Sequence, residues 1–92
     1  MSIKVNIPSF FQRYTDEHDT VEVNGTTIGE CLNDLIRQFP KMERMLFYEP
    51  NDLDDGVVIC LNREVLTAWD NPLNRRVVES DDISLLVIAA GG

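Results

Sequence analysis

The sequence predicts an α+β fold in which a mixed β-sheet carries one main helix on one face. Two observations predict it. Apolar residues recur with a strong helical period over residues 28–39 only, and short alternating or continuous apolar segments precede and follow that run. A chain of 92 residues is one domain and suits two packed layers. We therefore expect a folded domain over residues 1–88, followed by a tail.

The first two strands are predicted before the helix. Residues 2–7 alternate between polar and apolar side chains, as a half-buried strand does, and Pro8 ends the pattern. Residues 20–23 alternate in the same way and precede the turn signal Asn24-Gly25. Two such strands in succession suit a hairpin, after which the helix crosses one face of the sheet.

The helix is the clearest element of the sequence. Thr27 and Glu30 have the spacing of a capping box, in which the threonine hydroxyl accepts a helical N–H and the glutamate bonds back. Pro40 ends the run, and residues 41–47 show a weaker helical pattern. The apolar stripe of the helix consists of Ile28, Cys31, Leu32, Leu35, Ile36 and Phe39.

Two further apolar runs are predicted to be strands. Residues 57–61 are apolar throughout, and residues 83–88 are apolar on both faces, which favours inner positions in the sheet. Between them we expect a turn at residues 62–64, a short strand at 65–66, and Trp69 at the edge of the core. The expected core residues are Ile3, Val5, Ile7, Val21, Leu32, Leu35, Ile36, Ile59, Ile83 and Leu85.

Charge and composition restrict the class of partner. The chain has 8 basic and 16 acidic residues and a net charge of −8, which argues against nucleic acid and anionic membranes as partners. A basic protein partner is compatible with this charge. No signal-peptide pattern and no membrane-length apolar stretch occur, so we expect a cytoplasmic protein. Cys31 and Cys60 lie in apolar runs and are expected to be buried free thiols.

The sequence has no conventional pattern of a catalytic, metal or cofactor site. The single histidine, His18, lies in a polar turn and is expected at the surface. Asp52, Asp54 and Asp55 resemble calcium ligands superficially, but the closing glutamate of a calcium-binding loop is missing. We therefore expect no metal, no cofactor and no enzyme in its own right.

The end of the sequence is its most informative feature. An apolar strand leads directly into Ala89, Ala90, Gly91 and Gly92. Two terminal glycines arise by chance in roughly one chain in 200. Because glycine has no Cβ, such a tail can enter a narrow channel in almost any backbone conformation. Residues 89–92 are therefore expected to be a flexible tail that carries the carboxylate of Gly92 as its reactive group.

With these features in order, the sequence resembles the ubiquitin-like sulfur carriers, namely the small subunit of molybdopterin synthase and its thiazole-pathway and cysteine-pathway relatives. The resemblance covers nearly the whole chain, although Arg63 stands where the family commonly has glycine. The matching segments are the opening strand ending in Pro8, residues 23–30, Phe39-Pro40, Leu61-Asn62, Pro72-Leu73, residues 80–83 and Ala90-Gly91-Gly92.

The resemblance implies a β-grasp fold, with the last strand parallel to the first at the centre of the sheet. It also implies that an ATP-dependent, E1-like activating enzyme adenylates the carboxylate of Gly92. Sulfur then displaces AMP, and a sulfur-accepting synthase subunit uses the resulting thiocarboxylate in the biosynthesis of molybdopterin or a related cofactor. The ATP site and the nucleophile belong to these partners, so the chain is a carrier.

Two alternatives remain open at this stage. The chain could be a ubiquitin-like modifier that is conjugated through Gly92, or a β-grasp interaction module with an inert tail.

We also expect a docking surface on the open face of the sheet. If Ile83, Leu85 and Val87 face the helix, then Leu86 and Ile88 form an apolar patch beside the tail. The acidic turn at residues 79–82 is expected to steer this surface toward a basic rim.

Overall fold

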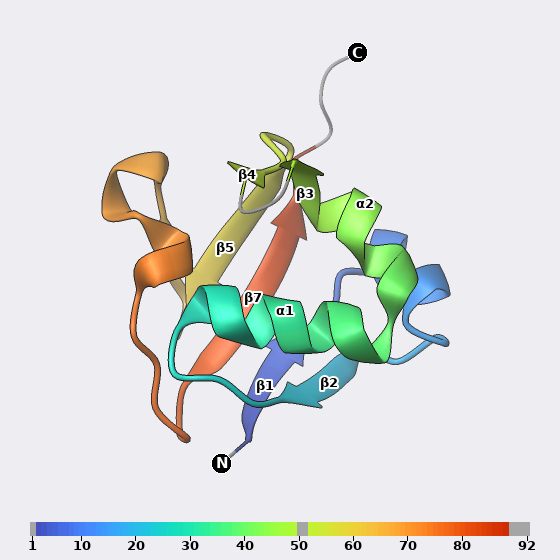
Figure 1. Ribbon diagram of the computed structural model, residues 1–92, viewed down its shortest axis with the longest axis horizontal. Coiled ribbons are helices and arrows are strands. Elements are labelled where there is room, and N and C mark those ends of the chain that lie inside the picture. Colours follow the sequence, from blue (N-terminus) through green and yellow to red (C-terminus); the bar gives the residue numbers. More distant parts are fainter. Residues whose placement is uncertain (1, 50–51, 89–92) are drawn as a thin grey trace.

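The computed structural model describes residues 2–49 and 52–88, so the predicted tail lies outside the described residues. A mixed five-stranded sheet has the order β2-β1-β7-β5-β6 and forms one layer (Figure 1). Its strands are β1 (Ile3–Asn6), β2 (Thr20–Val23), β5 (Val57–Leu61), β6 (Glu64–Leu66) and β7 (Asp82–Val87).

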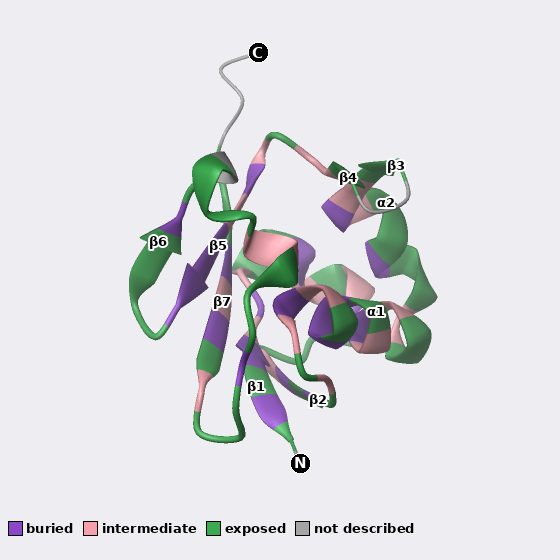
Figure 2. Cartoon of the chain, turned by 60° about the vertical axis from the view of Figure 1, so that its left-hand side comes forward, coloured by how far each residue is buried: buried purple, intermediate pink, exposed green. Residues whose placement is uncertain are grey.

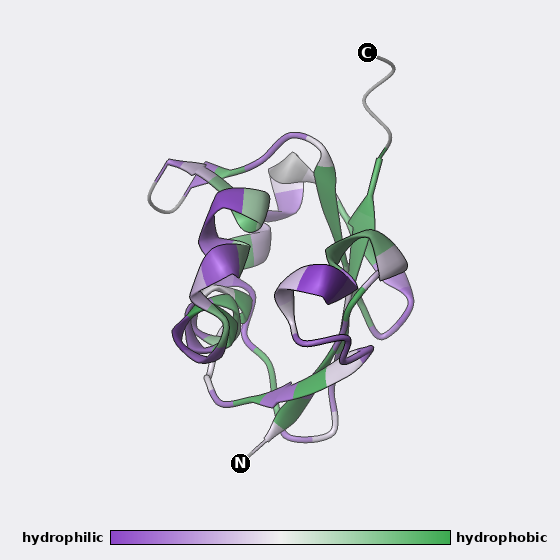
Figure 3. Cartoon of the chain, turned by 90° about the vertical axis from the view of Figure 1, so that its right-hand side faces the viewer, coloured by the Kyte–Doolittle hydropathy of each residue, from purple (hydrophilic) through white to green (hydrophobic). Residues whose placement is uncertain are grey.

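The remaining elements cover the sheet or connect its strands. Helix α1 (Ile28–Gln38) crosses one face and is followed by α2 (Glu43–Leu46). Figure 3 shows both helices on the same side of the hydrophobic strands. A small second sheet pairs β3 (Phe47–Glu49) with β4 (Asp52–Leu53). Residues 2–49 and 52–88 also contain four short 3-10 turns: Ser9–Tyr14, Pro40–Met42, Ala68–Asp70 and Pro72–Asn74.

The central strand of the sheet is β7. It pairs parallel with β1 on one side and antiparallel with β5 on the other. Strands β1 and β2 form the antiparallel hairpin expected from their spacing. The predicted α+β class, the β-grasp topology and the central position of the last strand are therefore confirmed.

Helix α1 begins at the predicted residue, but its glutamate has a different partner from the expected one. The hydroxyl of Thr27 accepts a hydrogen bond from the backbone N–H of Glu30 at 3.1 Å. The Glu30 carboxylate accepts from the backbone N–H and the hydroxyl of Thr26, both at 2.8 Å, rather than from the N–H of Thr27. These hydrogen bonds hold the pKa of Glu30 below its ordinary value.

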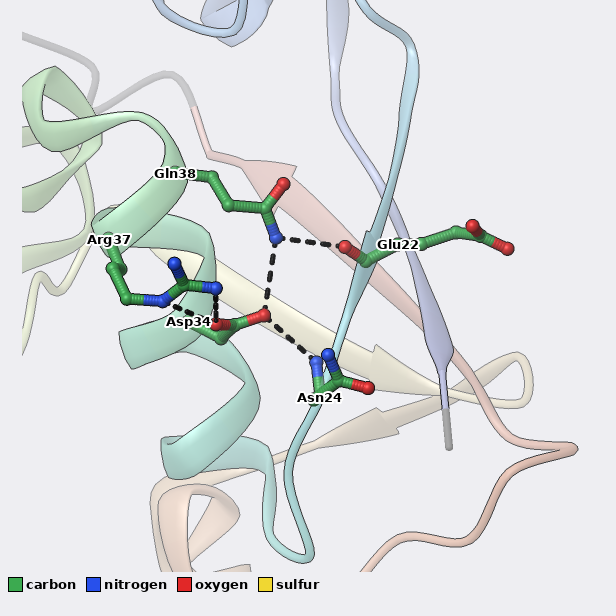
Figure 4. A network of polar contacts seen from close by, with 5 residues as sticks. All are labelled: Glu22, Asn24, Asp34, Arg37 and Gln38. Atoms are coloured by element: carbon green, nitrogen blue, oxygen red, sulfur yellow. Dashed lines mark hydrogen bonds and ion pairs between the residues drawn. The ribbon is translucent and has the colours of Figure 1, made fainter.

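Polar side chains of α1 occupy the free edge of β2 (Figure 4). The amide of Gln38 donates to the carbonyl oxygen of Glu22 at 2.9 Å, and the backbone N–H of Asn24 donates to Asp34 at 3.0 Å. Arg37 donates to the same Asp34 carboxylate at 2.6 Å. Burial works to raise the pKa of Asp34, but these hydrogen bonds hold it below its ordinary value. This edge of the sheet is thus blocked to other strands.

The core lies between the sheet and α1, and it contains most of the residues that the sequence predicts for it (Figure 2). Nine of the ten expected residues are buried, whereas Ile36 is only half-buried at the border of the helical stripe. Val87 was expected to face the helix, but it is 37% exposed because β7 extends past the helix there. Buried residues outside the expected set include Val23, Met42, Leu46, Leu61 and Val77.

The expectation for Trp69 is wrong. This side chain is 94% exposed and does not cap the core. Thr67 donates its backbone N–H and its hydroxyl to the Asp70 carboxylate, which closes the tight turn that carries Trp69. Leu66 and Leu73, on either side of this turn, contact the core in its place.

Arg63 offers a test of backbone strain. Asn62 and Arg63, in the turn between β5 and β6, have φ angles of 51° and 74°. Glycine adopts such angles without the steric cost that a Cβ adds. Replacing Arg63 by glycine should raise the free energy of unfolding by about 0.5–1 kcal/mol, since ~1–2 kcal/mol of strain is relieved and part is lost to chain entropy. Chemical denaturation measures this change.

Asn62 provides the matched control for that substitution. Its side chain accepts from the backbone N–H of Asp82 at 2.8 Å and donates to Asp81 at 2.9 Å. Asn62→Gly should therefore destabilise the protein, although it relieves a similar φ angle. A loss of stability in Arg63→Gly would show that the turn carries no such strain.

Candidate functional site

The site is built around the point where the chain leaves β7. The backbone N–H of Ile88 donates to the carbonyl oxygen of Gly56 at 2.8 Å. The N–H of Gly56 in turn donates to the carboxylate of Asp54 at 2.8 Å. This turn therefore fixes Ile88, the residue directly before the predicted tail. Ala89, Ala90, Gly91 and Gly92 lie outside the described residues, so their predicted flexibility and the role of Gly92 stay predictions.

An exposed apolar patch lies on the face of the sheet that α1 does not cover. Leu86 is 44% and Ile88 54% exposed. Val58 pairs directly with Leu86, and Val65, which is exposed on β6, belongs to the same face by strand alternation. Leu86 and Ile88 are thus accessible, as the sequence predicts, and their docking role stays a prediction. We call Val58, Val65, Leu86 and Ile88 the apolar patch.

The other half of this face is polar. The side-chain amide of Asn6 in β1 donates to the Asp82 carboxylate at 3.0 Å and to the Ser84 hydroxyl at 3.0 Å. Both partners belong to the first half of β7, whereas Leu86 belongs to its second half. The open face is therefore apolar only toward the end of β7 from which the tail continues.

The acidic turn before β7 lies at the end of the strand opposite Ile88, and its role in steering the docking surface toward a basic rim stays a prediction. Residues 79–82 lie at the start of β7, and six residues separate that end from Ile88, a distance of roughly 20 Å in a strand. Its carboxylates also have structural partners. Asp81 accepts from Asn62 and from the backbone N–H of Val78, so its pKa lies below its ordinary value. This turn stabilises the fold at the end opposite the tail.

A different acidic segment lies beside Ile88, at the base of the tail, and the sequence indicates for it only a superficial likeness to calcium ligands. It is the stretch around Asp54, whose carboxylate binds the turn that holds Ile88. A sequence signal existed. Residues 45–62 contain Glu49, Asp52, Asp54 and Asp55 and no lysine, arginine or histidine. Only the backbone hydrogen bond between Ile88 and Gly56 shows that this negative charge lies at the end of β7 from which the tail continues.

The cysteines and the histidine do not form a nucleophilic site. Both cysteines are buried free thiols, as predicted. Burial, together with the nearby Asp34 and Glu30 carboxylates, raises the pKa of Cys31 to about 11, so its thiolate is scarce at neutral pH. His18 is exposed, and its Nδ1 bonds the carbonyl oxygen of Thr15 at 2.7 Å. Residues 2–49 and 52–88 contain no cluster of side chains arranged to hold a metal ion.

No helix within the described part of the chain has the length and apolar character needed to cross a membrane.

Comparison with known proteins gives matches at the level of structure alone. No family model and no curated protein matches the sequence. A chain of the BexX/CysO complex from Amycolatopsis orientalis matches 98% of this chain over 99% of its own length, with 24% identity and a TM-score of 0.87. Small archaeal modifier protein 1 from Methanosarcina acetivorans matches 99% of this chain over 96% of its own length, with 18% identity and a TM-score of 0.85.

A third solved structure is the complex of subunits 1 and 2 of the molybdopterin-converting factor from Helicobacter pylori. One of its chains matches this chain over the full length of both, with 18% identity and a TM-score of 0.63. The chain therefore shares the β-grasp fold with these ubiquitin-like proteins, and the resemblance inferred from the sequence is confirmed at the level of fold.

Proposed function

We propose that this protein is a sulfur carrier and that the carboxylate of Gly92 is its reactive group. The observation that supports this most strongly is the exit of the tail from the central strand, beside an exposed apolar patch. The strand is held on both sides by β1 and β5, and Ile88 is fixed by Gly56. A rigid body that presents a thin glycine tail can place one carboxylate in the active site of another protein.

The chemistry follows from the carboxylate itself. With a pKa of ~3.5 it is ionised at neutral pH and resists nucleophiles. Attack of the carboxylate on the α-phosphorus of ATP, with loss of pyrophosphate, converts it to an acyl-adenylate. Sulfide (HS⁻) from the sulfur source then attacks the acyl carbon, the bond to the AMP oxygen breaks, and AMP leaves while the thiocarboxylate forms. The chain is the substrate of these reaction steps and supplies no nucleophile to them. This agrees with the lack of an ionised thiol at Cys31.

The proposed partners are an activating enzyme that uses ATP and a synthase subunit that accepts the sulfur. Two of the similar structures are complexes: one of BexX with CysO, and one of the two subunits of a molybdopterin-converting factor. Transfer of sulfur to a molybdopterin-type cofactor is our proposal for this chain. The experiment is incubation with the native activating enzyme, ATP and a sulfur source, followed by intact-mass measurement.

A second candidate function is protein modification through Gly92. It is favoured by the likeness to small archaeal modifier protein 1. The two functions are distinguished by the product, because conjugation gives an isopeptide ladder on target proteins and carriage gives a thiocarboxylate. A tail with neither product would identify an interaction module.

The apolar patch should bind the activating enzyme. Leu86→Asp is expected to weaken that binding about tenfold or more, because a leucine side chain contributes ~1.5–3 kcal/mol on burial. The free energy of unfolding should change by less than ~0.5 kcal/mol, since Leu86 is exposed. Calorimetric titration and urea denaturation measure the two quantities.

Val78→Asp is the matched control for Leu86→Asp. Val78 is 58% exposed, precedes β7 at the end opposite the tail, and the substitution adds the same charge. It should leave binding unchanged. If Leu86→Asp lost stability and binding to the same extent, Leu86 would be a core residue and the patch would have no docking role.

A further inference from the structure

A hollow beside the tail base carries an inference beyond the proposed carrier function. It has a volume of about 940 Å³ and lies between the first turns of α1, the stretch before β5, strand β6 and the 3-10 turn Pro72–Asn74. The bottom of the hollow is apolar, formed by Val57, Ile59, Leu66 and Leu73. Three of these side chains are buried and Leu73 is half-buried, so the floor is rigid. We call this hollow the α1–β6 groove.

The rim of the α1–β6 groove is acidic. Glu30, Asp52, Asp54 and Asp55 line it, and none of the described residues around it is a lysine, arginine or histidine. Glu30 and Asp54 already accept hydrogen bonds from Thr26 and Gly56. The side chains of Asp52 and Asp55 have no hydrogen-bond or ion-pair partner among the described residues. Two arginines lie outside this lining: Arg76, whose charge acts to lower the pKa of Glu30, and Arg75, whose guanidinium approaches the Glu64 carboxylate of β6 at 4.0 Å.

The groove also runs along an edge of the sheet. The opposite edge, at β2, is occupied by Gln38 and Asp34. Strand β6 is the other edge, and Leu66 and Thr67 line the groove at this edge. An extended segment can therefore lie beside β6, with its backbone at the sheet edge and alternate side chains directed into the groove.

From these three features we propose that the α1–β6 groove binds an extended cationic segment of a partner protein. Arginine or lysine side chains fit both parts of the groove, because their aliphatic stems can cover the apolar floor while their charged ends reach the free carboxylates of Asp52 and Asp55. The segment would lie next to the turn that fixes Ile88, so it would add a second contact beside the tail. This inference concerns binding alone and holds whether or not Gly92 is activated.

The test is an NMR titration of the full chain with a short peptide of alternating arginine and leucine. We expect chemical-shift changes at backbone amides that line the groove, such as those of Asn33, Leu66 and Thr67, and weaker binding as the salt concentration rises. The same peptide with glutamate in place of arginine should not bind. Shift changes centred on Leu86 and Ile88, the two residues of the apolar patch that do not line the groove, or equal binding of the glutamate peptide, would overturn the proposal.

Variants that remove the same charge at different positions distinguish binding in the groove from attraction by the overall negative charge of the protein. Asp52→Asn with Asp55→Asn should weaken binding of the arginine peptide about five- to tenfold, since each partly exposed ion pair contributes a factor of roughly two to five. Asp19→Asn with Glu79→Gln removes the same charge from exposed positions outside the groove and should leave affinity unchanged. An equal loss in both pairs would show that only net charge attracts the peptide, and the groove would then not be a specific site.

Discussion

Deletion of Gly92 is expected to lower thiocarboxylate formation at least ~100-fold while leaving the fold intact. The deletion moves the reactive carboxylate back by one residue, about 3.5 Å of extended chain. A displacement of ~1 Å in an active site can already cost ~100-fold in rate. The free energy of unfolding should not change, because the core residues all lie within residues 3–85. Intact-mass measurement after incubation with the activating enzyme gives the first quantity, and thermal unfolding gives the second.

Gly92→Ala is the control that keeps the length of the tail. It leaves the carboxylate at the same distance from Ile88 and adds only a Cβ, so its loss should be smaller than that of the deletion. Full activation of the deletion variant would show that the position of the carboxylate at Gly92 is not required. The proposed reactive group would then be wrong.

Leu35→Ala is expected to lower the free energy of unfolding by ~2–5 kcal/mol. Leu35 lies in α1 and is fully buried in the core between helix and sheet. Truncation removes the transfer free energy of its side chain and leaves a cavity that the rigid sheet fills poorly. This is a large part of a typical total of ~5–15 kcal/mol. Urea denaturation measures the change.

Asn33→Ala on the same helix is the control for Leu35→Ala. Asn33 is exposed, so its replacement should change the free energy of unfolding by less than ~0.5 kcal/mol. A loss below ~1 kcal/mol in Leu35→Ala would mean that the helix does not pack on the sheet through this face.

The elements that the sequence predicts well are those with a local signal. The stripe of α1, the first hairpin and the apolar run of β7 each follow from the spacing of apolar residues within a few positions. The half-buried Ile36 and the exposed Val87 differ from the predicted burial. Both lie at the border of the core, where the spacing of apolar residues does not indicate how deeply a side chain is buried. Trp69 was misplaced because a tight turn, closed by Asp70, directs it outward.

The candidate site could be predicted only in part. The accessibility of Leu86 and Ile88 follows from alternation along one strand. The acidic surroundings of the tail base do not follow from any local pattern, because they depend on the contact of Gly56 with Ile88, which are distant in sequence.

The most direct test of the carrier function is the intact mass of the full chain after incubation with ATP, a sulfur source and its native activating enzyme. We expect a mass gain equal to the difference between a sulfur and an oxygen atom, located by fragmentation at Gly92 and dependent on ATP. An unchanged mass under conditions in which the enzyme hydrolyses ATP, or a sulfur located on Cys31 or Cys60, would contradict it.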